Sequence, residues 1–371
     1  MSGCDSSMMP NFIVLPVYPV GFFHRRIAVV EVTRCCSGRS QARRYRGWML
    51  ETDADFVQRA RPPWVGVVTR DAIRHFAWGI GDDNPLWHDA SHAAASRWGG
   101  VVAPPSLLYA VDETTVAPGH AGLRRFYRSV EWAWFDALSE GTVLVPVVVA
   151  LGEGEVDGVL RQRGRVTFED VSGRVLAIAE TQCDRFAEPI QPVEDRPELR
   201  YSGPEIARIE ERILSEQRQG KVPRLIENVS VGEAIGEVVK GPLSIMDVVA
   251  WCAATQGMAS DADGYSDGGL HAEMATGPEQ VAWITQALTD WAGDDGFVHR
   301  LSVHILANPL LGSTTTVSGV VASVSAGGGD APSVEIEVEA TSESGAVIAQ
   351  GVGKVLLPSR ATGPVAVPLS D

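Results

Sequence analysis

The feature that most constrains the fold is an order of elements that occurs twice along the chain. In each half, apolar residues first recur at helical spacing, then fill a second helical run, and then alternate with polar residues as in half-buried strands. These segments cover 69–80, 106–111 and 130–186 in the first half, and 244–251, 279–291 and 301–357 in the second. A duplicated unit of helices and an antiparallel meander is the economical interpretation.

Length and composition indicate how the chain is divided. Its 371 residues suffice for two cores of ordinary size. Residues 1–48 hold three of the five cysteines and seven arginines against two acidic residues, so we expect a poorly ordered N-terminal extension there. A proline-rich stretch after residue 187 predicts a linker. The expected divisions are the extension at 1–48, domains at 49–187 and 223–360, a linker with a helix at 188–222 and a tail at 361–371.

Charge and hydropathy exclude several classes of function. The formal net charge is −16, which argues against nucleic acid or an anionic membrane as the main partner because both attract clustered Lys and Arg. No apolar run approaches the roughly 20 residues that cross a bilayer. Outside the extension only Cys183 and Cys252 are left, too few for a disulfide framework or a zinc site, which favours a reducing cytoplasm.

Polar side chains concentrate in one turn-rich segment between two helical patterns. It reads Ile-Gly-Asp-Asp-Asn-Pro-Leu-Trp-His-Asp over residues 80–89, and Trp-Gly-Gly-Val-Val-Ala-Pro-Pro follows over 98–105. Acidic, amide and imidazole groups in such a turn can reach a pocket without disturbing a packed core. We therefore expect the functional site of the protein in this segment.

The turn of residues 81–86, with His88 nearby, resembles the signature of MaoC-like (R)-specific enoyl-CoA hydratases. The stretch 98–105 resembles the FAS1-like N-terminal domain of two-domain acyl dehydratases. Segments similar to the C-terminal half of that group are Lys-Gly-Pro-Leu-Ser at 240–244, Thr-Asp-Trp at 289–291, Gly-Asp-Asp-Gly at 293–296 and Leu-Leu-Pro-Ser-Arg at 356–360. The resemblance spans residues 60–360 and implies an α+β double hotdog fold, two long helices each wrapped by an antiparallel sheet.

The resemblance also implies a hydro-lyase that reversibly adds water to a trans-2-enoyl thioester of CoA or acyl carrier protein, with no metal and no cofactor. Such a reaction needs a base for the water, an acid for the α-carbon and a donor for the enolate oxygen. In the family an Asp and a His hold the water. Asp82 matches the acid, Asn84 matches the residue that organises the turn, and His88 is the nearest imidazole.

The expected contacts with the substrate come from Asn84, from Trp87 and from the segment of Gly99, Gly100 and Val101. The resemblance implies a backbone amide near the start of the long helix as the oxyanion donor. The amides around residues 99–102 are the natural candidates, because a helix N-terminus presents unpaired N–H groups.

Two departures from the family pattern bear on activity. The family places the His five residues after the Asp, where this chain has Trp87, and His88 comes one residue later. Neighbouring side chains in an extended segment point to opposite sides, so only a local bulge would bring His88 to the same water. In the second half the equivalent position falls near Gly257 or Met258, and no Asp-x-Asn-Pro turn is present there.

These departures leave alternatives open. Asp82 could be a turn residue bonded to its own backbone. The chain could be a hotdog thioesterase that uses Glu113 or Glu279, or a degenerate subunit that binds an acyl thioester or serves as a scaffold. Hotdog units pair through their sheets, so two units in one chain already form a pseudo-dimer, and a homodimer is a further option.

Overall fold

The computed structural model describes residues 28–32, 43–47, 65–112, 124–186, 201–255, 274–326, 331–367 and 369–370. The chain divides into two compact units, residues 1–46 and 47–371. Strands β1 (Ala28–Val32) and β2 (Arg43–Gly47) form a two-stranded sheet. Most of the extension expected at 1–48 lies outside the described residues, so it stays a prediction, as do the other expected boundaries.

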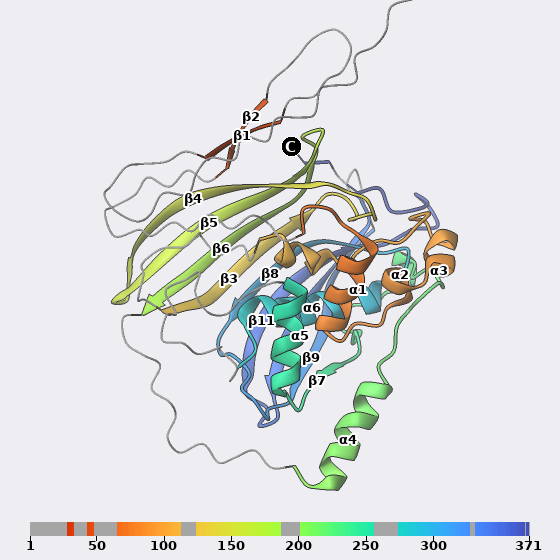
Figure 1. Ribbon diagram of the computed structural model, residues 1–371. Helices are drawn as coiled ribbons and strands as arrows, with labels where there is room; N and C mark the ends of the chain where they lie inside the picture. Colours follow the sequence, from red (N-terminus) through yellow and green to blue (C-terminus); the bar gives the residue numbers. More distant parts are fainter. Residues whose placement is uncertain are drawn as a thin grey trace, which may run out of the picture. The chain divides into compact units, whose positions relative to one another are not determined.

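One nine-stranded antiparallel sheet runs through both halves of the larger unit (Figure 1). Its strands are β3 (Arg124–Trp134), β4 (Leu144–Val156), β5 (Val159–Asp170), β6 (Val175–Phe186), β7 (Val238–Lys240), β8 (Phe297–Ile305), β9 (Thr315–Ser325), β10 (Ser333–Ser342) and β11 (Val347–Leu356). Their order is β4-β5-β6-β3-β8-β11-β10-β9-β7. The halves meet where β3 pairs with β8, with Trp132 opposite Leu301. The two meanders expected from the alternating pattern are thus joined edge to edge.

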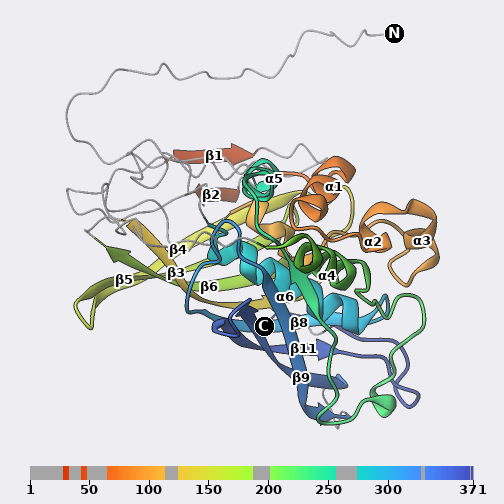
Figure 2. The same ribbon diagram turned by 90° about the horizontal axis from the view of Figure 1, so that it is seen from below.

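The helices of the larger unit are α1 (Arg70–Gly79), α2 (Pro85–His88), α3 (Ala90–Ala95), η1 (Pro105–Ala110), α4 (Gly203–Leu214), η2 (Ile226–Asn228), α5 (Ile245–Thr255) and α6 (Gly277–Ala292). Helices α1, α2, α3, α5 and α6 lie on one side of the sheet (Figures 1 and 2). In α6 every residue except Thr289 is buried, as expected of a helix surrounded by its sheet and the other half. Helices α1 and α5 pack together so closely that a Cβ on Gly79 would come within 2.6 Å of Ala254 Cβ.

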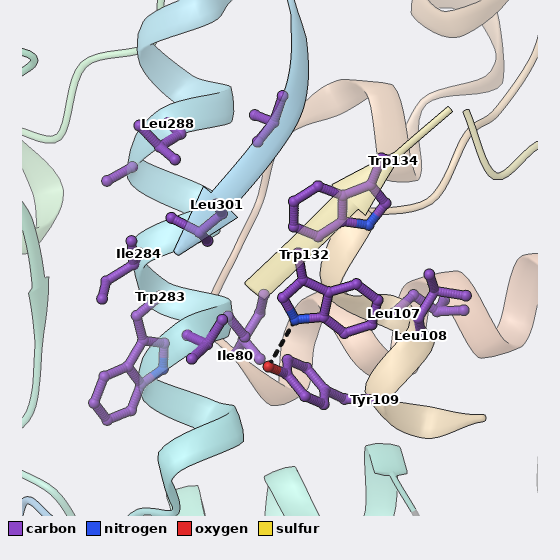
Figure 3. Packing of buried hydrophobic residues seen from close by; sticks show 14 of the residues in the cluster. Ile80, Leu107, Leu108, Tyr109, Trp132, Trp134, Trp283, Ile284, Leu288 and Leu301 are labelled. Atoms are coloured by element: carbon purple, nitrogen blue, oxygen red, sulfur yellow. Dashed lines mark hydrogen bonds between the residues drawn. The ribbon is translucent and has the colours of Figure 1, made fainter. Parts of the chain in front are cut away.

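The first half fills the space under its sheet differently from the second. The helical run expected at 106–111 is the short 3-10 helix η1. Aromatic side chains from β3 and β5 pack with it: Trp132 stacks on Trp134 with ring centroids 5.1 Å apart, and Phe168 stacks on Trp132 at 5.7 Å. The Trp132 indole donates to the Tyr109 hydroxyl at 2.9 Å (Figure 3). Trp132 and Trp134 therefore belong to the core.

The first turn of α6 depends on a glycine. A Cβ on Gly277 would lie 2.7 Å from Tyr127 Cβ, so we expect Gly277→Ala to lower the free energy of unfolding by about 1–3 kcal/mol. Gly203 offers a matched control, because it also precedes a proline at the start of a helix with a capping box, α4, and has open space around it. Gly203→Ala should change stability by less than about 1 kcal/mol. Thermal unfolding of both variants tests this, and equal effects would contradict the role given to the Tyr127 contact.

Candidate active site

The turn of residues 80–89 lies between the end of one helix and the start of the next. Helix α1 ends at Gly79, and Gly81 has a positive φ of +65°, which glycine adopts without strain. Asn84 then caps α2, with its Oδ1 accepting from the Leu86 amide at 3.0 Å and Pro85 in the first helical position. Asn84 is thus the N-cap of α2, and its role in the site stays a prediction.

The carboxyl group of Asp82 lies inside this turn and is 1% exposed. Its Oδ1 accepts from the Asn84 amide at 3.0 Å, and its Oδ2 accepts from the Trp87 indole Nε1 at 2.9 Å. Burial raises the pKa of Asp82 above the usual range of an aspartate, although both hydrogen bonds oppose the rise. A carboxylate with a raised pKa is a stronger base than an ordinary aspartate, which suits it to the transfer of a proton.

His88 faces the backbone of Asp82. Its Nε2 lies 3.0 Å from the Asp82 carbonyl oxygen, and since a carbonyl can only accept, Nε2 carries the proton. The His88 ring stacks on Trp78 with centroids 5.9 Å apart. Its Nδ1 is buried without a hydrogen-bond partner among the described residues. The indole of Trp87, at the spacing where the family has histidine, thus occupies the place beside the carboxylate.

Two basic residues from later in the chain hold the turn against α6. Lys240 Nζ donates to the carbonyl oxygens of Ile80 and Gly81, at 2.8 and 3.0 Å. Arg218 Nε donates to Asp290 Oδ1 on α6 at 2.8 Å, and its guanidinium also pairs with Asp83. The first-half turn is therefore anchored by charges that come from more than 130 residues further along the chain.

The same region concentrates buried carboxyl groups. Burial, together with the charge of Asp82, raises the pKa of Asp290 well above its usual range. Burial likewise raises the pKa of Glu216, whose Oε1 accepts from the Val239 amide at 2.8 Å. Burial lowers the pKa of Lys240, against the attraction of Glu216 and Asp82. Asp82, Asp290, Glu216 and Lys240 thus form a group of ionisable side chains whose pKa values are all shifted by burial.

Sequence reasoning missed Arg218 as a member of this cluster. It lies just beyond the linker helix, and no local pattern connects it with a turn in the first half. Lys240 and Asp290 both stand in segments that resemble the second half of the family, at 240–244 and 289–291. That resemblance marked the segments, but spacing gave no reason to bring either side chain to Asp82.

A small cavity of about 50 Å³ lies beside the turn, between the two halves. Its lining includes Asn84 and Trp87 from the turn and Thr289 and Gly293 from α6 and its end. The rest of the lining is largely apolar: Leu86, Trp98, Val102, Ala103, Pro105, Trp134, Asp136, Ala137, Leu138, Ala292, Asp294, Gly296, Phe297 and Val298. Trp87 thus lies both against the carboxylate and in the cavity wall.

Most of the expected oxyanion donors, residues 99–102, lie outside the cavity wall. Val102 and Ala103 line it, whereas Gly99, Gly100 and Val101 do not. The Gly99 amide donates to the Ser96 carbonyl at 3.1 Å, and the Ala103 amide to the Leu138 carbonyl at 2.8 Å. The assignment of the residues 99–101 as oxyanion donors stays a prediction.

A set of polar contacts fixes the segment before residue 99 onto the end of α6. His92 Nε2 lies 2.7 Å from Asp294 Oδ2, and the Trp98 indole donates to the Asp294 carbonyl at 3.0 Å. Arg97 donates to the carbonyl oxygens of Asp295 and Val365, at 2.9 and 2.7 Å. These bonds join the halves across the cavity and hold its walls in place.

The carboxylates proposed for a thioesterase have different positions. Glu113 lies outside the described residues, as does the second-half region around Gly257, Met258 and 261–273. Glu279 is 1% exposed and closes a capping box with Thr276 at the start of α6. Burial raises the pKa of Glu279 to about 8. Its side chain caps the start of the helix and is not in the cavity wall.

Metal and membrane interactions can be assessed for the described part of the chain. No three of its His, Cys, Asp or Glu side chains are grouped so that they could hold a metal ion. No helix in it has the length and hydropathy to cross a membrane.

Comparison with known proteins places these features in context. Residues 58–145, which contain the turn, match the family described as the FAS1-like dehydratase domain region. A UPF0336 protein of Streptomyces avermitilis is 40% identical over 63 residues, a match that covers 17% of this chain and 42% of that protein. The chain therefore spans less than half the length of this curated relative.

Solved structures extend the similarity to the second half. A MaoC-like dehydratase superposes with a TM-score of 0.59 at 17% identity, over 78% of this chain and 94% of its own. A conserved hypothetical protein from Mycobacterium tuberculosis, described as having a double hotdog fold, gives a TM-score of 0.50 at 13% identity, over 78% and 92%. Residues 58–145 thus match the FAS1-like dehydratase domain region, and the chain has a double hotdog fold similar to these solved structures, as the resemblance of its sequence implied.

Proposed function

We propose that the protein reversibly adds water to a trans-2-enoyl thioester carried by CoA or an acyl carrier protein. The observation that carries this proposal is the buried Asp82 carboxyl, which the Asn84 amide and the Trp87 indole fix beside a cavity between the halves. Its raised pKa suits a group that takes a proton and gives it back. The dehydratase family match and the hotdog fold support a thioester as the substrate.

The proposed step needs one carboxyl group. Asp82 takes a proton from water as the hydroxide adds to the β-carbon, and the thioester becomes an enolate held by backbone N–H groups. The protonated Asp82 then returns its proton to the α-carbon. The product is a 3-hydroxyacyl thioester, and the carboxylate is restored. Trp87 can orient the carboxylate but cannot exchange a proton, so it has no part in the transfer.

The direct test is turnover by the full chain. Purified protein is mixed with trans-2-enoyl-CoAs of increasing chain length, and the loss of the enoyl thioester absorbance is followed. Saturated acyl-CoAs are run in parallel with a thiol reagent. Loss of the enoyl signal without thiol release supports the proposal. Thiol release from saturated substrates instead would replace it with a thioesterase.

A second candidate, binding of an acyl thioester without turnover, is favoured by one observation. Both Asp82 oxygens already accept a hydrogen bond, and the donor on Oδ2 is the indole of Trp87 rather than an imidazole. Calorimetric titration with acyl-CoA separates the two candidates. Saturable binding with no enoyl turnover at any chain length supports this second candidate and rejects the first.

Restoring the family spacing should increase activity. Trp87→His places an imidazole five residues after Asp82, where it can share the proton transfer, so we expect the hydration rate to rise roughly 10-fold or more. Loss of the large buried ring should lower stability by about 2–4 kcal/mol. Trp98→His is the matched control, because Trp98 lines the same cavity without contacting Asp82. An equal or lower rate in Trp87→His would contradict the role given to the displaced imidazole.

A further inference from the structure

One buried polar side chain on α6 has no explained role. Gln286 is 2% exposed, and neither its Oε1 nor its Nε2 has a hydrogen-bond partner among the described residues. An amide left unpaired in the interior loses its bonds to water and gains nothing in return. By contrast, the hydroxyl of the preceding residue, Thr285, is satisfied by the Val281 carbonyl at 2.7 Å.

Helical spacing places Gln286 on the face of α6 that meets the turn. Thr289 and Gly293, three and seven residues further on, line the cavity together with Asn84 and Trp87. Asp290, four residues further on, is close enough to Asp82 for their charges to interact. Residues three, four and seven apart share one face of a helix. Gln286 is therefore on the face of α6 that the cavity and Asp82 share.

We propose that Gln286 and Asp82 together bind one water molecule between α6 and the 82–87 turn. An ionised carboxylate has about four acceptor positions, and Asp82 uses two of them within the described residues. The amide adds one acceptor and two donors. A buried water needs two to four polar partners, which this pair supplies. Neither side chain is in the wall of the cavity of about 50 Å³, but Thr289, three residues after Gln286, is, and so are Asn84 and Trp87, which donate to Asp82.

This site deepens the proposed function, on which its catalytic meaning rests. In the family the water is held by an acid and an imidazole, and here the imidazole is absent from the carboxylate. The Gln286 amide would take over the holding of the water, while Asp82 alone takes its proton. Gln286 is then a positioning residue: it fixes the water oxygen for attack and exchanges no proton.

The experiment compares wild-type protein, Gln286→Met and Thr285→Val, all as the full chain. Methionine has nearly the shape of glutamine without its polar atoms, and Thr285→Val removes a neighbouring hydroxyl that already has its partner. Buried long-lived waters are counted by oxygen-17 magnetic relaxation dispersion, and thermal unfolding is measured alongside. Gln286→Leu replaces Gln286→Met if the latter does not fold.

The proposal expects about one long-lived water fewer in Gln286→Met and no change in Thr285→Val. An unchanged count in Gln286→Met, with a higher Tm from removal of an unpaired amide, would overturn it. If the wild type hydrates enoyl thioesters, Gln286→Met should reduce kcat roughly 10- to 100-fold without moving the pH profile. Water loss in a chain that shows no turnover would leave this site standing and reject the proposed function alone.

Discussion

Replacement of Asp82 by asparagine should lower the rate of enoyl thioester hydration roughly 10²- to 10⁴-fold. The amide keeps the size of the side chain but cannot accept a proton from water. One of its two ends must also meet the Trp87 indole or the Asn84 amide with a donor, which removes one hydrogen bond. Enoyl absorbance decay under saturating substrate measures the loss.

The loss must be separated from damage to the fold. Asp71→Asn is the matched control, because Asp71 is an exposed acid of α1 that pairs with Arg74 one turn away. We expect its rate to stay within about twofold of wild type, in line with the small energies of exposed ion pairs. Thermal unfolding of both variants checks that each is folded. A folded Asp82→Asn protein with full activity would show that the carboxyl is only a turn residue.

Stability should fall as the pH rises through the range where Glu279 ionises in the folded protein. Its pKa is raised to about 8 by burial, above its value in an unfolded chain. The folded state therefore holds a proton that the unfolded state has lost, and the penalty grows by about 1.4 kcal/mol per pH unit between the two pKa values. Glu279→Gln cannot ionise, so this part of the fall should be missing from the variant, and its stability relative to wild type should increase by about 3–5 kcal/mol between pH 5 and 8.

Glu205 provides a control of opposite sign. It occupies the same position of a capping box at the start of α4, but it is exposed and its pKa is lowered by hydrogen bonds from Ser202. The ionised Glu205 contributes to the stability of the folded protein above the pKa it has in the unfolded chain. This contribution is lost only when the pH falls through its lower pKa in the folded protein. The free energy of unfolding of both variants is measured by chemical denaturation between pH 3 and 9. Compared with wild type, Glu279→Gln should differ at the alkaline end of this range and Glu205→Gln at the acidic end. If Glu279→Gln and wild type lose the same stability toward alkaline pH, the Glu279 carboxyl is not buried in its protonated form.

The order of elements could be predicted from the sequence because periodicity reports which face of an element is buried. The meanders and the long helix α6 follow from it directly, as alternation and helical spacing persist over many residues. The short η1 did not follow, because a run of six apolar residues fits several local conformations. The bulky Trp132 and Trp134 fill space under the first sheet, a packing outcome that no local pattern encodes.

The candidate site was predictable only within its turn. The spacing of Asp82, Trp87 and His88 showed that the imidazole is displaced, and the structure places the indole N–H on the carboxylate. Arg218 and Lys240 could not be anticipated, because they reach the turn only after the chain has folded back over more than 130 residues. Local sequence specifies a turn, whereas the charges around it depend on tertiary packing.

The pairing of β3 with β8 has a consequence for how the two halves can diverge. In a symmetric dimer of identical chains, any substitution occurs on both sides of the interface at once. Here the strands that meet, with Trp132 opposite Leu301, belong to one polypeptide and differ in sequence. Each copy of the unit is thus free to specialise: one can supply an acid and the other the helix that faces it, at a fixed ratio of one to one. If either half were expressed without the other, its strand at this junction, β3 or β8, would be left as an unpaired sheet edge.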